Sequence, residues 1–268
     1  MTYLTFSLGY SNMNSECQTL SIRYQIMGGY DAVNYFKRKN IMFIGHYAVS
    51  LALKSVQPKL SLGWLFIAVQ FVDFLFFSFA LFGLEKFSLI ENYTESTHFK
   101  LDYMPFSHSL LASFLWALAI YLLVTLFMSS QQKQVMNTAL VIFVAVVSHW
   151  CLDLLVHTPD LPLFLDNSYL LGFGLWNIAW LTYLLEAIVI LAGLYWYMTS
   201  TNKTGVKDTT IAKYGMPTFV VVLLVINVIN IFGPLSEEDT VVSTAISALL
   251  AYSIFALIAF WLDRKRVS

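Results

Sequence analysis

Long runs of apolar residues, separated by short polar segments, recur along the chain after position 41. Runs of about 20 apolar residues have the length that an α-helix needs to cross the hydrocarbon core of a bilayer. Only the connection at 85–103 is both polar and sizeable. The pattern therefore predicts an all-α fold, a polytopic membrane helical bundle of about seven transmembrane helices. The predicted spans are 41–56, 61–84, 104–128, 135–157, 169–198, 215–235 and 241–262.

The composition agrees with this assignment. Of the 268 residues, 58% are hydrophobic and 12% are charged, and the mean hydropathy is +0.69. A soluble domain carries about twice this charged fraction, roughly 25%. The net charge is −1 and no basic patch indicates nucleic-acid binding, so the lipid bilayer is the expected partner.

The distribution of lysine and arginine predicts the orientation of the bundle, because cytoplasmic loops of membrane proteins are enriched in these residues. If the C-terminus "DRKRVS" is cytoplasmic, nine of the eleven basic residues after position 41 lie on the cytoplasmic side, in or near the loops 57–60, 129–134 and 201–214. The opposite side has only Lys86 and Lys100, together with the acidic stretch "LSEEDT". We therefore expect a cytoplasmic C-terminus.

Residues 1–41 form a polar tail without the apolar segment of a signal peptide. The basic residues of this tail would lie on the wrong side of the membrane in the predicted orientation. Either the short first span does not cross, or the tail is not part of the mature protein and translation starts at Met42; we favour the second explanation. The rest divides into a five-helix core that carries the candidate site, 42–200, and two C-terminal transmembrane helices with a basic cytoplasmic tail, 201–268.

Ionisable residues concentrate in one layer of the predicted bundle. An α-helix rises about 1.5 Å per residue, and this rise places ionisable residues of four predicted spans in the outer layer of the membrane. On the fourth span, His149, Asp153 and His157 lie within an arc of about 80°, because residues four apart stack on one helix face. Such a stripe can face the interior of a bundle. The residues that share the layer are His46, Asp73, His108, His149 and Asp153.

Imidazole and carboxylate groups without thiolates are typical ligands of catalytic zinc, and they also suit manganese or ferrous iron. A cation would also compensate the cost of burying carboxylates in a low-dielectric layer. The pattern therefore predicts a divalent metal site, with zinc as the first choice and His46, Asp73, His108, His149 and Asp153 as ligands. Two simpler interpretations stay open: each histidine forms only local hydrogen bonds, or Asp153 only orients His149.

The order of these residues resembles the membrane-bound metal-dependent hydrolases, a family of predicted bacterial inner-membrane proteins likened distantly to zinc-dependent phospholipase C. The resemblance covers about residues 42–180, and it implies a metal-dependent hydrolase of the inner membrane that starts near Met42. A second acid before Asp73 and a basic residue before "HS", both frequent in the family, are absent here. The matching segments are "IGHYAVSLALK" with His46, "AVQFVDF" with Asp73, "PFSHSLL" with His108 and "SHWCLDLLVH" with His149 and Asp153.

Two classes of function account for the pattern. The first is a membrane-embedded hydrolase of an amphiphilic substrate, such as a lipid-linked phosphoester, at the extracytoplasmic side; His157 or Asp160 would be the catalytic base or a second-metal ligand. The second is a proton- or cation-coupled transporter that uses Asp73, Asp153 and Glu186. Glu186 favours the transporter because it is expected below the cluster, whereas no internal duplication of the transporter kind is present. A metal that only joins helices is a third interpretation.

Overall fold

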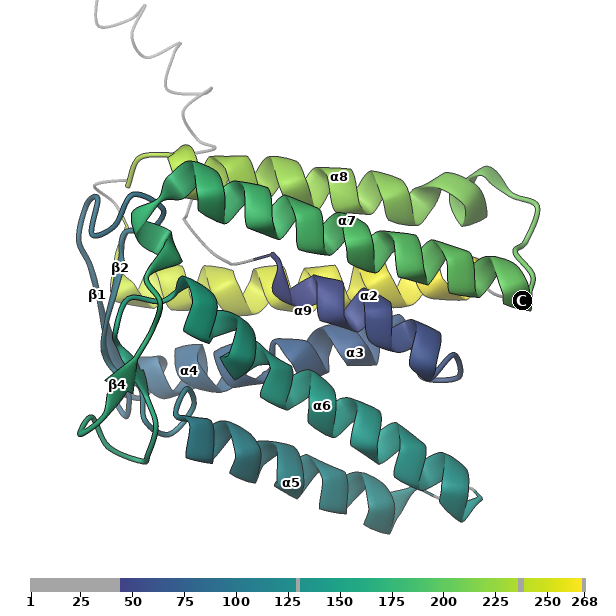
Figure 1. The fold of residues 1–268 in the computed structure, drawn as a ribbon, viewed down its shortest axis with the longest axis horizontal. Coiled ribbons are helices and arrows are strands. Elements are labelled where there is room, and N and C mark those ends of the chain that lie inside the picture. The colour runs from purple at the N-terminus through teal and green to yellow at the C-terminus, as the bar shows by residue number, and fades with distance from the viewer. Residues whose placement is uncertain (1–43, 129–130, 236–238, 267–268) are drawn as a thin grey trace, which may run out of the picture. The chain divides into compact units, whose positions relative to one another are not determined.

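The computed structural model describes residues 44–128, 131–235 and 239–266, apart from the side chains of residues 203 and 204. The predicted tail at 1–41, with the start proposed at Met42, lies outside the described residues. The described chain is mostly helical (Figure 1). Its α-helices are α2 (His46–Val56), α3 (Leu62–Val69), α4 (Phe71–Leu81), α5 (Leu110–Phe127), α6 (Gln132–Val156), α7 (Ala179–Thr204), α8 (Thr210–Phe232) and α9 (Val241–Arg266).

Five of these helices, α5 to α9, are long and apolar enough to cross a membrane. The pair α3 and α4 counts as one further span only if it is taken together, and it is bent by 53° at Gln70. The described chain is thus consistent with a multi-pass, all-α membrane bundle, but the predicted number of seven spans is not confirmed. The difference arises at the first predicted span: α2 has 11 residues, about 16 Å of helix, whereas a hydrocarbon core is about 30 Å thick.

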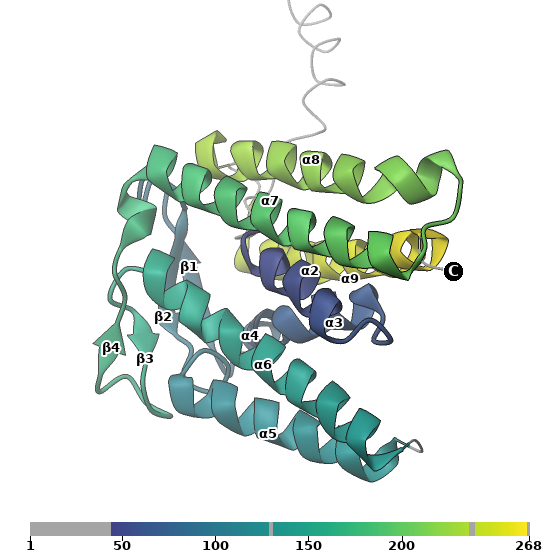
Figure 2. The ribbon, with the colours of Figure 1, turned by 45° about the vertical axis from the view of Figure 1, so that its right-hand side comes forward.

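The short helix α2 lies inside the bundle, in contact with α3, α6 and α7 (Figure 2). Its side chains Tyr47 and Leu51 are fully buried, as is Ile44 just before it. The backbones of α2 and α7 approach closely at Gly193, where an added Cβ atom would lie 2.6 Å from the carbonyl oxygen of Ala48. Small residues permit such close helix packing in membrane bundles. The packing of α2 is therefore set by the interior of the bundle.

The polar connections at one end of the bundle form two small antiparallel sheets (Figure 1). The connection predicted at 85–103 is a hairpin, with Leu89 opposite Phe99. The predicted start of the fifth span is also not helical: a strand and a 3-10 turn precede Ala179, with Gly174 at a φ of 73°. The elements are β1 (Lys86–Leu89) with β2 (Phe99–Tyr103), β3 (Leu161–Pro162) with β4 (Leu170–Leu171), and the 3-10 helix η1 (Leu175–Asn177).

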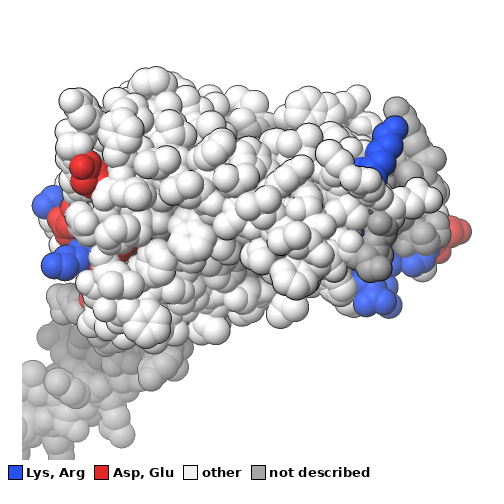
Figure 3. Space-filling view, turned by 90° about the horizontal axis from the view of Figure 1, so that it is seen from below, with Lys and Arg blue, Asp and Glu red and all other residues white. Residues whose placement is uncertain are grey.

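The surface separates charged ends from an apolar middle. On the face drawn in Figure 3, the charged side chains lie at the two ends, and the belt between them is uncharged. Large apolar side chains of α5 point outward, among them Leu126 and Phe127, which are 75% and 80% exposed. Such a face is unfavourable in water and suits contact with lipid chains.

A buried ion pair and its hydrogen bonds join four helices, α2, α3, α7 and α9, at the end of the bundle that carries the C-terminus. Lys54 Nζ lies 2.6 Å from Asp263 Oδ2, and both side chains are buried. Asp263 also accepts hydrogen bonds from the backbone N–H of Leu62 at 3.1 Å and from the hydroxyl of Tyr197 at 3.2 Å. Lys54, counted above among the basic residues of the cytoplasmic side, is therefore a structural residue that ties α2 to α3 and α9.

Candidate metal centre

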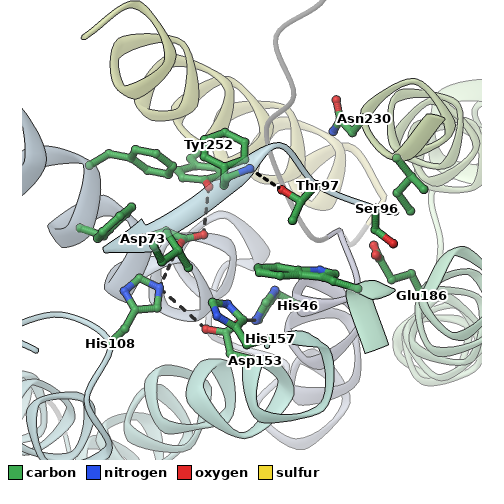
Figure 4. A pocket seen from close by; sticks show the side chains of 16 residues that line it. His46, Asp73, Ser96, Thr97, His108, Asp153, His157, Glu186, Asn230 and Tyr252 are labelled. Atoms are coloured by element: carbon green, nitrogen blue, oxygen red, sulfur yellow. Dashed lines mark hydrogen bonds and ion pairs between the residues drawn. The ribbon is translucent and has the colours of Figure 1, made fainter. Parts of the chain in front are cut away.

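The structure brings the five predicted ligands together. Figure 4 shows four of them, His46, Asp73, His108 and Asp153, around one cavity. His46 begins α2, Asp73 lies in the first turn of α4, His108 precedes α5, and His149 and Asp153 lie in the last turns of α6. All but Asp73 are almost completely buried. One ligand atom from each of His46, His149 and Asp153 lies within 4.8 Å of the others, and the same holds for Asp73, His108 and His149.

Four of these residues present donor atoms at spacings that suit a tetrahedral ion. His108 Nε2 lies 3.2 Å from Asp73 Oδ1 and 3.8 Å from Asp153 Oδ2. His149 Nε2 lies 3.6 Å from Asp73 Oδ1 and 3.1 Å from Asp153 Oδ2. A tetrahedral zinc ion with bonds of about 2.0–2.1 Å holds its donors about 3.3 Å apart. The four N–O distances lie around this value, which is compatible with one ion between the four side chains.

The break between α3 and α4 holds two of the ligands in place. At this break, the carbonyl oxygen of Val69 accepts a hydrogen bond from His149 Nδ1 at 2.7 Å. Gln70 Nε2 donates to Asp73 Oδ2 at 3.0 Å, and the hydroxyl of Tyr252 donates to the same oxygen at 2.9 Å. Asp73 Oδ2 is thus held by two donors, and Oδ1 is the oxygen that faces the histidines. A break of this kind is what frees backbone groups for partners outside their own helix.

A buried glutamate that the sequence analysis missed orients His108. Glu85 accepts hydrogen bonds from the backbone N–H groups of Phe106 and Ser107, at 2.8 and 2.9 Å, and from Ser107 Oγ at 2.6 Å. Since Ser107 Oγ gives its proton to Glu85, it accepts from His108 Nδ1 at 2.8 Å. Burial raises the pKa of the Glu85 carboxyl, and its hydrogen-bond donors oppose that shift. The only signal in the sequence was an acid directly after an apolar run.

The two residues predicted as catalytic have different places. His157 follows α6, and its Nε2 lies 3.6 Å from Asp153 Oδ1. Its Nδ1 donates to Asp160 Oδ1 at 2.8 Å, and Asp160 Oδ2 accepts from the hydroxyl of Thr158 at 2.8 Å. The imidazole packs on Trp176, with ring centroids 4.1 Å apart. His157 therefore directs Nε2 toward the centre, whereas Asp160 accepts the hydrogen bond from Nδ1 on the other side of the ring and fixes its orientation.

The histidines of the centre are arranged for a cation. In His108, His149 and His157, Nδ1 donates to an acceptor, so Nε2 of the neutral ring carries a lone pair. Each of these Nε2 atoms faces a carboxylate oxygen of Asp73 or Asp153, and two lone pairs repel unless a cation lies between them. Asp153 Oδ2 is also buried and accepts no hydrogen bond, which is costly for a carboxylate. A divalent ion fits this donor set; the alternative is an additional proton on each ring.

His98, the fifth histidine, serves the hairpin. Its Nδ1 accepts from the backbone N–H of Asn92 at 2.8 Å, and its Nε2 donates to the carbonyl oxygen of Gly233 at 3.0 Å. These two contacts attach the β1–β2 connection to the end of α8. His98 is therefore a structural residue and a suitable control for substitutions in the centre.

Glu186 supports the start of α2. Its Oε2 accepts from the backbone N–H of Ile44 at 3.0 Å, where α2 has no side-chain cap of its own. An unpaired N–H group at a buried helix start is unfavourable, and the carboxylate satisfies it. Glu186 also lines the same cavity as His46 and Asp153. It thus lies at the level of the cluster rather than below it, contrary to the sequence-based expectation.

The cavity lies between the ligands and the β1–β2 connection (Figure 4). Its volume of about 90 Å³ is room for several waters or a small head group. Ser96, Thr97 and Asn230 add polar groups to its wall. Among the described residues that line it, none is lysine or arginine. Its aromatic lining consists of Phe76, Phe77, Phe99, Trp176 and Tyr252.

No family model, no curated protein and no solved structure matches this chain. The resemblance to the membrane-bound metal-dependent hydrolases thus stays a prediction from the segments quoted above. Function has to be argued from the chemistry of the site itself.

Proposed function

We propose that this protein is a membrane-embedded hydrolase that depends on a divalent metal, zinc as the first choice, and acts on an amphiphilic substrate. The observation that carries the proposal is the four-donor set of His108, His149, Asp73 and Asp153, in which lone pairs face one another at the spacing of zinc ligands. The resemblance to the membrane-bound metal-dependent hydrolases supports the same conclusion.

Each part of the site has a task in this proposal. A zinc ion bound at this centre would supply a Lewis acid and, at a position that keeps an open coordination place, would lower the pKa of a coordinated water to about 7. Gln70 and Tyr252 hold the Asp73 carboxylate, and Ser107 holds the ring of His108. His157 faces the cavity, where its Nε2 would serve either as the catalytic base or as a ligand of a second metal ion. The ring remains oriented because Asp160 fixes its Nδ1.

The cavity indicates the kind of substrate. Its wall combines aromatic and polar side chains, and its volume of about 90 Å³ suits a small polar group. An amphiphile would therefore place only its polar head there, with its apolar part along the apolar surface of the bundle. If the substrate is a lipid-linked phosphoester, its phosphate has no basic side chain among the described lining residues and would depend on the metal for charge compensation.

The transporter alternative has less support. Its main argument was a carboxylate below the cluster, and Glu186 instead binds the backbone at the start of α2 and lines the same cavity. The hydrolase accounts for the described site with fewer assumptions.

The proposal is tested by metal content and hydrolysis. The full-length chain, purified in detergent and incubated with zinc, should retain the metal after dialysis, and His149→Ala should lose it because a central donor is removed. The matched variant His98→Ala should retain it, since the hydrogen bonds of His98 join backbone groups of Asn92 and Gly233, outside the donor set. Amphiphilic phosphoester and carboxylic ester probes should be hydrolysed, and a chelator should stop the reaction. A protein that binds no divalent metal refutes the proposal; metal without hydrolysis favours a structural ion.

The proposed location is the inner membrane of a bacterial cell, with the C-terminus in the cytoplasm and the site toward the extracytoplasmic side. The excess of basic residues at the C-terminal end of the bundle supports this orientation. Reporter fusions after the loop at 201–214 and after the C-terminus should both report the cytoplasm. A reporter at 201–214 that proves to be outside would reverse the orientation.

A further inference from the structure

The four-donor set has a consequence for catalysis. A zinc ion with four protein ligands is coordinatively complete, which is typical of structural sites, whereas catalytic zinc has three protein ligands and an open place. An ion held by His108, His149, Asp73 Oδ1 and Asp153 Oδ2 therefore has no open place of its own for a substrate.

A second set of donors lies on the other side of Asp153. His46 Nε2 is 3.1 Å from Asp153 Oδ1, and His157 Nε2 is 3.6 Å from the same oxygen. These three side chains are at most 3% exposed, and all of them line the cavity. Asp153 thus presents Oδ2 to one pair of histidines and Oδ1 to another pair.

The rings of His46 and His149 support this division. They are stacked, with centroids 4.0 Å apart and planes inclined by 22°. Their Nε2 atoms lie at the same distance, 3.1 Å, from different oxygens of the Asp153 carboxylate. Two stacked rings thus address the two oxygens of one carboxylate, which is compatible with a carboxylate that bridges two ions.

We propose that a second divalent cation binds between His46, His157 and Asp153 Oδ1, so that Asp153 bridges two metal positions. This inference rests on the proposed function for the first ion. With three protein donors, the second position keeps coordination places open, and it adjoins the cavity. The second position is therefore the one that a substrate reaches, and the first one is mainly a support for it.

Simple hydrogen bonds are the competing explanation. His46 Nε2 also lies 3.3 Å from the carbonyl oxygen of His149, so a proton on this nitrogen could be shared between that carbonyl and Asp153. In that case the protein binds only one ion, and His46 is a hydrogen-bond donor. The two explanations differ in the number of ions bound, which can be measured without an activity assay.

The experiment is a cobalt(II) titration of the full-length chain in detergent, followed by metal analysis after dialysis. Two equivalents should bind: the first should give the strong visible bands of a four-coordinate ion, and the second should give weaker bands. His157→Ala should bind one equivalent and keep the strong bands, because the four-donor set is intact. Asp160→Asn should weaken the second binding step by about 10–100-fold. The control His98→Ala should still bind two.

The outcomes separate this inference from the proposed function. A wild-type chain that binds a single ion and still hydrolyses its substrate overturns the second position alone, as does His157→Ala binding two ions. A chain that binds no ion refutes the second position and the proposed function together. If His157→Ala does not fold, the number of equivalents bound by the wild type decides.

Discussion

Two serines flank His108, and they allow a sharp test of how the centre is held. Ser107 Oγ accepts from His108 Nδ1 at 2.8 Å and donates to Glu85 at 2.6 Å, so Ser107→Ala removes both contacts. Glu85 keeps its two backbone donors, from Phe106 and from residue 107 itself, at 2.8 and 2.9 Å. The turn before α5 should therefore survive, while the His108 ring loses its orienting partner.

The expected effect on metal affinity follows from this loss. Removal of a group that orients a metal-binding histidine weakens metal affinity by about 10–100-fold, or about 1.4–2.7 kcal/mol of binding free energy. The dissociation constant for zinc should rise by this factor in Ser107→Ala, measured by competition with a chromophoric chelator on the purified full-length chain.

Ser109→Ala is the matched control. Ser109 Oγ caps α5 by accepting from the backbone N–H of Ala112 at 2.9 Å and makes no contact with His108 Nδ1. Its loss should lower stability by about 1 kcal/mol and leave the zinc affinity at its wild-type value. If Ser107→Ala binds zinc as tightly as the wild type, or if both variants lose the same affinity, the orienting role of Ser107 is refuted.

Two predictions concern the bundle. Asp263→Ala should lower the free energy of unfolding in detergent by about 3–5 kcal/mol because the Lys54 ammonium stays buried without its carboxylate partner. The double variant Lys54→Met/Asp263→Leu should recover the part of this loss that comes from the unpaired charge, while the Leu62 N–H and the Tyr197 hydroxyl still lack their acceptor; equal losses in the single and double variants would contradict the pairing. Gly193→Val should lower both stability and zinc affinity, since a Cβ atom there would lie 2.6 Å from the carbonyl oxygen of Ala48 and would displace α2. The neighbouring Ala192→Val, on an exposed position, should change neither, and equal effects of these two substitutions would count against the close contact.

Local spacing was sufficient wherever the site lies on one helix. His149, Asp153 and His157 recur at intervals of four, and helical geometry alone puts them on one face. The structure shows all three facing the centre, although His157 lies one residue beyond the end of α6. The apolar runs likewise indicated the membrane-like character of the bundle, because it depends on the hydropathy of each segment alone.

Hydropathy could not distinguish a span from a buried half-helix. The run at 41–56 is apolar in either case, and only the packing of α2 against α7 shows that this helix lies in the interior. The depth of Glu186 in the bundle was also predicted wrongly. The fifth span was predicted to begin at residue 169, but the chain there forms a strand and a turn and the helix begins only at Ala179, so Glu186 lies nearer to the helix start than expected.

Contacts between distant segments were decided by the tertiary structure. At the helix break near Gln70, the Val69 carbonyl accepts from His149, which is 80 positions away in the chain. Before α5, Glu85 accepts from the backbone of Ser107, which is 22 positions away. Periodicity and hydropathy describe the environment of each segment, but they do not predict which buried polar groups form hydrogen bonds with one another. That pairing depends on how the helices pack, because each buried donor or acceptor has to find its partner in another segment.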